Sequence, residues 1–125
     1  MFTNEQLLLK DLTARLLYGV KVKIGKYDYE LVGYNPQENE TQPIVVKFYK
    51  NDIAYYVHIS INDYKPYLRS LDSMTDEEAE EYHELCEWDD WEDIYFDTVA
   101  SIDWLLEHHF DVWDLISKNL AIKMR

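Results

Sequence analysis

The sequence predicts one α+β domain over residues 1–125: an N-terminal helix, a four-stranded antiparallel meander and then two to three C-terminal helices. Three observations predict it. Apolar residues recur at helical spacing near the start, alternate with polar residues between positions 20 and 61, and return to helical spacing after position 75. Residues 1–69 are expected to form a helix-plus-sheet half, and residues 70–125 an acidic helical half. A small barrel is an alternative closure of the meander.

The N-terminal helix is expected over residues 4–17. Asn4 is a suitable N-cap and Glu5 lies in the first turn. Gly19 stands where helices commonly end with a left-handed residue. The apolar residues that share one face of this helix are Leu8, Leu9, Leu12 and Leu16. This pattern is typical of a helix that lies on a sheet.

Four strands are expected between residues 20 and 61. Residues 20–24 and 27–31 alternate apolar and polar side chains around a turn at Gly25 and Lys26, which predicts a hairpin. The polar residues 34–43 form a surface loop. Residues 44–49 and 53–61 make a second hairpin around Asn51 and Asp52, and the two hairpins in sequence make the meander.

Helices follow from residue 75. Thr75 and Glu78 have the spacing of a capping box, which predicts a helix start. Its buried side is expected to hold Ala79, Tyr82, Leu85 and Cys86. Residues 88–97 either continue this helix or form an irregular elbow. A third helix is expected over about residues 98–109, from the spacing of Val99, Ile102, Leu105 and Leu106, and a last one from Asp111 or Asp114 through Ile116.

The formal net charge of −13 comes from one region. The 48 residues from Ser70 to Ser117 contain 17 acidic residues and no lysine or arginine, whereas residues 1–69 carry a net +1 and residues 118–125 a net +3. The four tryptophans and the single cysteine also lie in this stretch. Nucleic acids and anionic membranes repel such a surface, so the expected partners are basic proteins or cations.

Compartment follows from what the sequence lacks. One cysteine cannot form an internal disulfide, and the N-terminal residues lack the basic and apolar segments of a secretory signal. No stretch approaches the roughly 18 apolar residues of a membrane span. We therefore expect a cytoplasmic protein without membrane contact. Homo-oligomerisation is left open.

Three stretches of the chain together form a distinctive pattern. They are residues 11–22 (DLTARLLYGVKV), residues 65–78 (KPYLRSLDSMTDEE), and residues 103–111 with 115–121 (DWLLEHHFD and LISKNLA). In this order they resemble a family of small uncharacterised proteins of Bacteroides-type gut bacteria and their prophages. The resemblance implies a phage or mobile-element context and no site residues. The chain departs from the family pattern at Leu17 and Ser70, where proline is common, at residues 112–114, and in the helix after Thr75, where lysines usually accompany the glutamates.

The sequence disfavours four other kinds of site. The row Tyr34, Tyr49 and Tyr56 with Lys21, Lys23, Lys47 and Lys50 could stack single-stranded nucleic acid, but the neighbouring acids oppose it. A metal site could recruit His83, Cys86, His108 and His109, yet adjacent histidines on a helix diverge by about 100°. Residues 89–93 lack the spacing of a calcium loop. No nucleophile elbow or phosphate loop occurs, so no cofactor and no enzyme is expected.

The acidic stretch costs stability. The first-turn acids after Thr75 favour the helix through its dipole. Seven like-charge pairs at spacings of three or four residues between positions 76 and 87 oppose it by roughly 1.5–3.5 kcal/mol. Because mixed charge would serve solubility equally well, an unrelieved run indicates a surface kept for a partner.

The leading hypothesis is an acidic inhibitor of phage or mobile-element type that mimics nucleic acid and occupies a basic site on a host defence or regulatory protein, in the manner of an anti-CRISPR protein. One alternative is a non-enzymatic accessory or assembly module that binds another protein through apolar helix surface. A second is a cryptic enzyme or metal-binding protein. The predicted partner-binding residues are Glu77, Glu80, Glu81, Glu84, Glu87, Trp88, Asp89, Asp90, Trp91 and Asp93.

Overall fold

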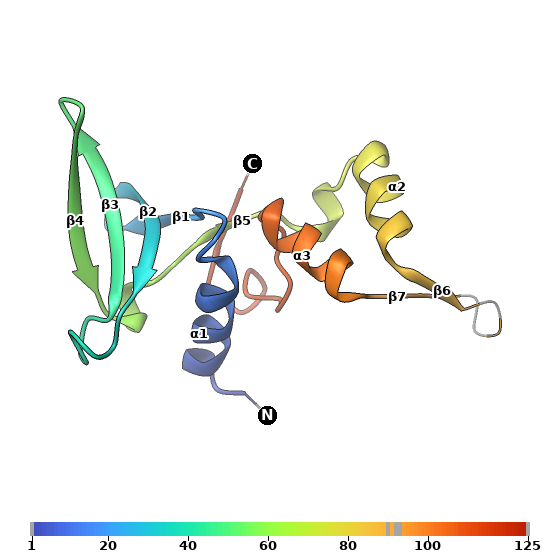
Figure 1. The fold of residues 1–125 in the computed structure, drawn as a ribbon, viewed down its shortest axis with the longest axis horizontal. Helices are drawn as coiled ribbons and strands as arrows, with labels where there is room; N and C mark the ends of the chain where they lie inside the picture. Colours follow the sequence, from blue (N-terminus) through green and yellow to red (C-terminus); the bar gives the residue numbers. More distant parts are fainter. Residues whose placement is uncertain (1, 90, 92–93, 125) are drawn as a thin grey trace.

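The computed structural model describes residues 2–89, 91 and 94–124 and has the predicted α+β class (Figure 1). A four-stranded sheet stands at one end of the long axis, helix α2 and a small hairpin stand at the other, and helices α1 and α3 lie between them. None of the helices in the described part of the chain has the length and apolar composition needed to cross a bilayer.

Helix α1 spans Asn4–Arg15. Its N-cap is Thr3 and not Asn4 as predicted: the Thr3 hydroxyl accepts from the amide of Gln6, and the Gln6 side chain accepts from the amide of Thr3. Threonine wins this position because the reciprocal pair satisfies two amide donors at the helix start. Gly19 follows the helix with φ +63°, a left-handed conformation that favours glycine. A Cβ there would lie 2.8 Å from Glu30 Oε1, which is the end of a flexible side chain and can move aside.

The meander is confirmed. Strands β1 (Lys21–Ile24), β2 (Tyr27–Tyr34), β3 (Ile44–Lys50) and β4 (Ile53–Ile59) pair antiparallel in sequence order. The barrel alternative is not realised, because β1 and β4 lie at opposite edges of an open sheet in the described structure. Asn51 and Asp52 both have positive φ, 53° and 65°, as a two-residue type I′ hairpin turn requires.

One face of the sheet packs against α1 and forms the main core. The buried apolar residues of this cluster are Leu8, Leu12, Val20, Val22, Leu31, Ile44, Val46, Ile59, Tyr64, Leu68, Leu115 and Ala121. Residues 115 and 121 belong to it, so the end of the chain completes the core of the N-terminal half. We call this part, residues 2–69 and 110–124, the body.

A buried ionic network lies beside this core. Arg15 and Asp11 are both inaccessible, and Arg15 Nε donates to Asp11 Oδ1 at 2.6 Å. Tyr64 donates its hydroxyl to Asp11 Oδ2, and Arg15 Nη2 donates to the carbonyl of Phe110. Burial raises the pKa of the Asp11 carboxyl, and its contacts with Arg15 and Tyr64 oppose that shift. The network ties α1 to a residue 95 positions further along the chain.

The helices expected after Thr75 and over about residues 98–109 are both present, and the segment between them differs from the prediction. Helix α2 spans Asp76–Leu85, and residues 88–97 contain a hairpin of β6 (Glu87–Asp89) and β7 (Ile94–Phe96) instead of a helix or an elbow. Helix α3 spans Val99–Glu107. Val99, one of the four apolar residues whose spacing predicted this helix, is its first residue and is 82% exposed.

The expected last helix is absent from residues 111–121, which form turns. Asp111 explains this: its carboxylate accepts the amides of Leu115 and Ile116, and Asp114 and Asn119 adopt φ of 58° and 59°. Side-chain capture of amides competes with helix formation. The chain then forms β8 (Ile122–Lys123), which pairs parallel with β5 (Tyr67–Leu68).

Residues 70–109 leave and rejoin the body at one point. The amide of Arg69 donates to the carbonyl of His109 at 2.8 Å, and the amide of Asp111 donates to the carbonyl of Arg69 at 2.9 Å. The two ends of this segment are therefore neighbours, and Figure 1 shows α2 and the β6–β7 hairpin reaching away from the body. We call residues 70–109 the acidic arm.

Candidate functional site

A second, smaller core lies where the acidic arm meets the body. Trp104, Leu105 and Phe110 are buried, and the partly buried residues Met74, Tyr82, Leu85, Ile102 and Val112 pack against them. The capping box at Thr75 and Glu78 is confirmed, and the predicted inner residues Ala79, Tyr82, Leu85 and Cys86 are half-buried. Helix α2 therefore turns one face to α3 and the other to solvent.

Glu78 is a structural residue. Arg69 donates two hydrogen bonds to it, from Nη1 at 2.8 Å and from Nη2 at 2.7 Å, and the Arg69 guanidinium also lies 4.2 Å from the centre of the Phe110 ring. The Arg69 contact and the amide of Thr75 lower the pKa of Glu78 to about 2. This pair fixes the start of α2 to the body.

Glu81 is also held within the arm. Its carboxylate accepts a hydrogen bond from Trp104 Nε1 at 3.1 Å, although the residue as a whole is exposed. The structure thus places one of the predicted partner-binding residues in the contact between α2 and α3, where its second role is to satisfy a mostly buried indole. The sequence offers no signal for this pairing across 23 positions.

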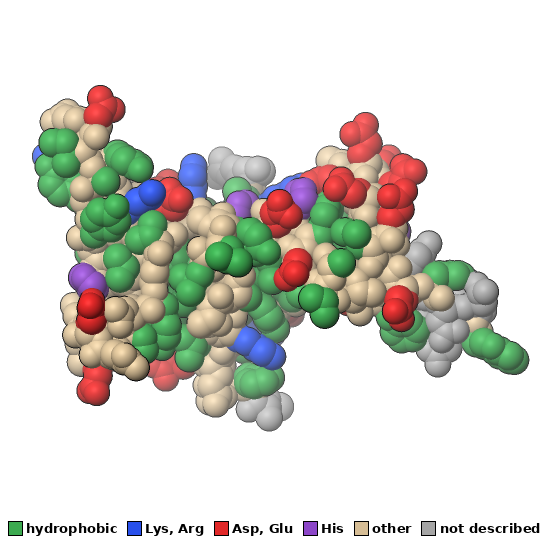
Figure 2. Space-filling view, in the orientation of Figure 1, with side chains coloured by type: hydrophobic (Ala, Val, Ile, Leu, Met, Phe, Trp, Pro, Cys, Tyr) green, Lys and Arg blue, Asp and Glu red, His purple; other side chains and the backbone are tan. Residues whose placement is uncertain are grey.

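The remaining predicted acids of α2 and its end lie on the solvent side. Figure 2 shows acidic side chains gathered over α2 at the far end of the molecule. The predicted residues Glu77, Glu80, Glu84 and Glu87 are all exposed. Trp88 and Trp91 are 46% and 96% exposed on the adjoining hairpin. We call these six residues the acidic surface.

The other three predicted partner-binding residues, Asp89, Asp90 and Asp93, are not part of the acidic surface as defined. Asp89 ends strand β6 and pairs through its backbone with Ile94. Asp90 and Asp93 lie outside the described residues. The prediction did not include Phe96, which ends β7 opposite Glu87 and is 42% exposed beside the acidic surface. The aromatic residues clustered between positions 88 and 96 are typical of short strands, and this signal could have indicated a hairpin there.

A hydrogen-bonded hub fixes the hairpin to the helices. Asp97 accepts hydrogen bonds from the hydroxyls of Tyr82 and Ser101, and the Cys86 thiol lies 3.9 Å from the same oxygen. The Thr98 hydroxyl donates to the carbonyl of Leu85 at 2.6 Å. Burial and the Asp97 carboxylate raise the pKa of Tyr82. The hairpin is thus attached at its base to both α2 and α3.

Three of the residues considered for a metal site contact other side chains of the acidic arm. Cys86 contacts Asp97, and His108 stacks on Trp104 with ring centres 4.1 Å apart. His83 lies beside the Tyr82 ring. Over the described ranges, no three histidine, cysteine or acidic side chains converge as metal ligands would.

The proposed aromatic platform is divided between two faces of the sheet. Lys47 pairs with Tyr56 and lies 5.4 Å from the Tyr49 ring, so these residues share the face turned away from α1. Tyr34 pairs with Ile44, which is buried under α1. The outer face also carries Glu30 opposite Lys47, so its charge is mixed.

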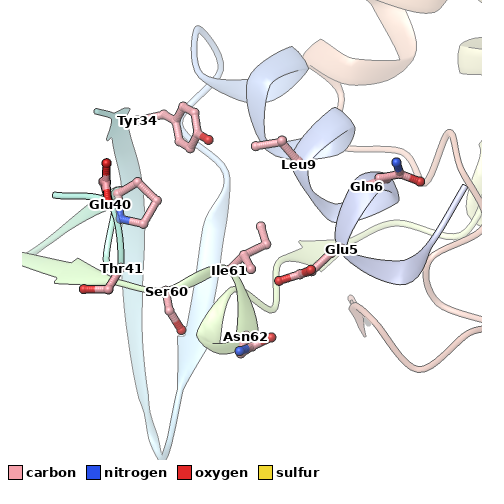
Figure 3. Close-up of a pocket in the computed structure, with 10 residues that line it drawn as sticks. Glu5, Gln6, Leu9, Tyr34, Glu40, Thr41, Ser60, Ile61 and Asn62 are labelled. Atoms are coloured by element: carbon pink, nitrogen blue, oxygen red, sulfur yellow. The ribbon is translucent and has the colours of Figure 1, made fainter. Parts of the chain in front are cut away.

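An open cleft of about 410 Å³ lies between α1 and the sheet. Leu9 on α1 and Tyr34 on β2 point toward each other across it (Figure 3). Glu5 and Glu40 are its acidic lining residues, and both are exposed. The cleft belongs to the body and is separate from the acidic surface.

Comparison of the chain with protein-family models, with curated proteins and with solved structures returned no match.

Proposed function

We propose that the chain is a binding protein whose acidic surface occupies a basic, nucleic-acid-binding site on another protein, without chemistry of its own. One observation carries this proposal. Four exposed carboxylates, from Glu77 to Glu87, stand beside two exposed tryptophans on an arm that contains no lysine or arginine. A solvated helix face of this kind has no internal counter-charge, so a basic partner would relieve its repulsion.

The geometry supports mimicry of a nucleic acid strand. Successive turns of an α-helix are about 5.4 Å apart, so Glu77, Glu80 and Glu84 place negative charge on successive turns of α2. Glu87 follows at the start of β6, directly after the helix. The indoles of Trp88 and Trp91 come next, where they offer the stacking surface that bases offer. The resemblance to prophage proteins adds a context in which the partner is a host defence or regulatory protein, as for an anti-CRISPR protein.

An assembly module is the second candidate, and one observation favours it. Phe96 and Val99 expose 42% and 82% of their surface on the same arm, which would suit an apolar contact with a virion or accessory protein. The two candidates differ in salt dependence, because screening weakens contacts between charges and leaves apolar contacts largely unchanged.

The test neutralises the acidic surface without altering its shape. A variant with Glu77→Gln, Glu80→Gln, Glu84→Gln and Glu87→Gln keeps good helix formers at the three helical positions and a side chain of the same shape at position 87. A matched control removes the same charge from the body, with Glu38→Gln, Glu40→Gln, Asp52→Asn and Asp63→Asn, all at exposed positions. Each protein is immobilised and exposed to host proteins previously retained on DNA-cellulose.

Mimicry predicts that the wild type and the body control retain a basic protein that free duplex DNA releases, and that the arm variant retains none. Retention that survives neutralisation of the arm, or that DNA does not compete, would contradict it. Loss of retention with Phe96→Ser and Val99→Ser, independent of salt, would instead identify the assembly module.

A further inference from the structure

The two edge strands of the sheet, β1 and β4, differ in whether another backbone segment covers them. At the β1 edge, the amide of Lys23 donates to the carbonyl of Lys65 at 3.0 Å and Val22 bridges to Pro66, so the segment leading to β5 covers it. At the β4 edge, no backbone segment of the described chain pairs with the strand apart from β3. Figure 1 shows β4 at the outer side of the sheet, at the end of the molecule opposite the acidic arm.

The β4 edge lacks the features that protect exposed edges. Natural edge strands carry lysine, proline or a bulge that discourages pairing with another strand. Strand β4 reads IAYYVHI, with no charged residue and no proline, and its seven residues pair with β3 without a bulge. Ile53 and Tyr56 are 57% and 62% exposed.

The direction of the free backbone groups follows from the turn. Residues that flank a two-residue hairpin loop form a hydrogen-bonded pair, and the pattern alternates from there along the strands. Lys50 and Ile53 flank the loop, so alternate residues from Ile53 onward bond to β3. The amides and carbonyls of Ala54, Tyr56 and His58 therefore point outward.

The strand is nearly symmetric about Tyr56. An antiparallel pairing of two copies with Tyr56 opposite itself places Ala54 opposite the partner's His58, and these outward-facing residues exchange about six backbone hydrogen bonds. The intervening pairs are Tyr55 with Val57 and Ile53 with Ile59, which are aromatic or β-branched residues on both sides. A strand that is complementary to itself in this register suits a two-fold axis.

We propose that β4 is a homodimer interface, in which two copies of the chain pair β4 antiparallel about Tyr56 and join their sheets into one of eight strands. Charge permits this arrangement, because residues 1–69 carry a net +1 while the acidic arms lie at the far ends of the two copies. The inference is independent of the function of the arm.

The test uses the position on the axis. Tyr56→Lys places two like charges opposite each other, and so does Tyr56→Glu, so each variant alone should dimerise roughly tenfold or more weakly than the wild type. An equimolar mixture of the two places lysine opposite glutamate and should restore a dimer that contains one copy of each. Sedimentation equilibrium measures all three samples, and circular dichroism monitors folding.

Tyr49→Lys is the matched control, because Tyr49 is 63% exposed on β3 and away from the edge, and it should leave the dimer intact. A wild type that is monomeric up to about 1 mM, a Kd in the range of the weakest specific complexes, would overturn the proposal. So would a Tyr56→Lys variant that dimerises as tightly as the wild type, or a mixture that stays monomeric. The variant with four glutamines on the acidic surface should dimerise normally, which separates this test from that of the acidic surface.

Discussion

Arg69 grips Glu78 through two parallel hydrogen bonds of 2.8 and 2.7 Å, although the two residues lie on opposite sides of the point where the acidic arm leaves the body. Arg69 is the last basic residue before the stretch that has none. The helix that carries the most concentrated negative charge is thus attached to the body by a charge-assisted contact.

Replacing Glu78 with glutamine should separate the two roles of this carboxylate. Glutamine keeps the capping box with Thr75, but the ionic contact with Arg69 is lost, so the free energy of unfolding at pH 7 should fall by about 1 kcal/mol. The pKa of Glu78 is lowered to about 2 from 4.5, so its contribution is complete above pH 4.5 and disappears as the pH falls toward 2. Urea unfolding at several pH values should show wild type and variant converging in that window. Glu77→Gln, without this partner, is the control.

Reversing one charge of the acidic surface should stabilise the protein. Glu80 has like charges at Asp76, Glu77 and Glu84, three or four residues away on α2. Glu80→Lys turns these repulsions into attractions and should raise the free energy of unfolding by roughly 1–2 kcal/mol at low salt. Glu40→Lys on the body should change it by less than half of that. A gain that is unaffected by 1 M salt would contradict the electrostatic cause.

The buried network predicts an asymmetry between removing one ion and removing both. Asp11→Ala leaves the inaccessible Arg15 without its counter-ion and should destabilise the fold by roughly 3–5 kcal/mol. The double variant Asp11→Leu with Arg15→Met removes both charges and should lose less. Thermal unfolding of the two variants measures the difference, and a double variant less stable than the single one would refute this account.

His109 should weaken the fold below neutral pH. It has φ of 64°, its Nδ1 is buried without a hydrogen-bond partner in the described structure, and burial, followed by the nearby Arg15, lowers its pKa below 6.5. The unfolded chain therefore binds a proton more readily than the folded one, and stability falls as the pH drops below 6.5. His109→Asn keeps a residue that tolerates the left-handed conformation and removes the titration. The difference in free energy of unfolding between variant and wild type should favour the variant more at pH 5.5 than at pH 8. An equal difference at the two pH values would contradict this.

Patterns between residues close in sequence, such as alternation and capping spacing, predicted the sheet and the start of α2. The meander followed from alternation, and the start of α2 followed from Thr75 and Glu78 three positions apart. The failures came from side chains that compete with the backbone. Thr3, and not Asn4, is the N-cap of α1. The Asp111 carboxylate accepts hydrogen bonds from the amides of Leu115 and Ile116, where a last helix was expected.

The sequence predicted the candidate site as a run of acidic residues, and the structure shows which of those residues face solvent. The run of acids indicated where charge concentrates, but it could not distinguish Glu80, which faces solvent, from Glu81, which accepts from the Trp104 indole. That distinction depends on where α3 lies, which is a tertiary contact across 23 positions. The hairpin after α2 was undecided because three-residue strands are too short for periodicity to show.

The bridge between Arg69 and Phe110 holds the two ends of the acidic arm together. A segment whose two ends are backbone neighbours can change in length at little entropic cost, since doubling a loop costs only about 0.6 kcal/mol. Backbone hydrogen bonds join this segment to the body at its two ends, around Arg69 and residues 109–111, and helix α3 also lies against α1. Changes in the length of the arm should therefore cost little, while the sheet, helix α1 and the closing tail keep their contacts with one another.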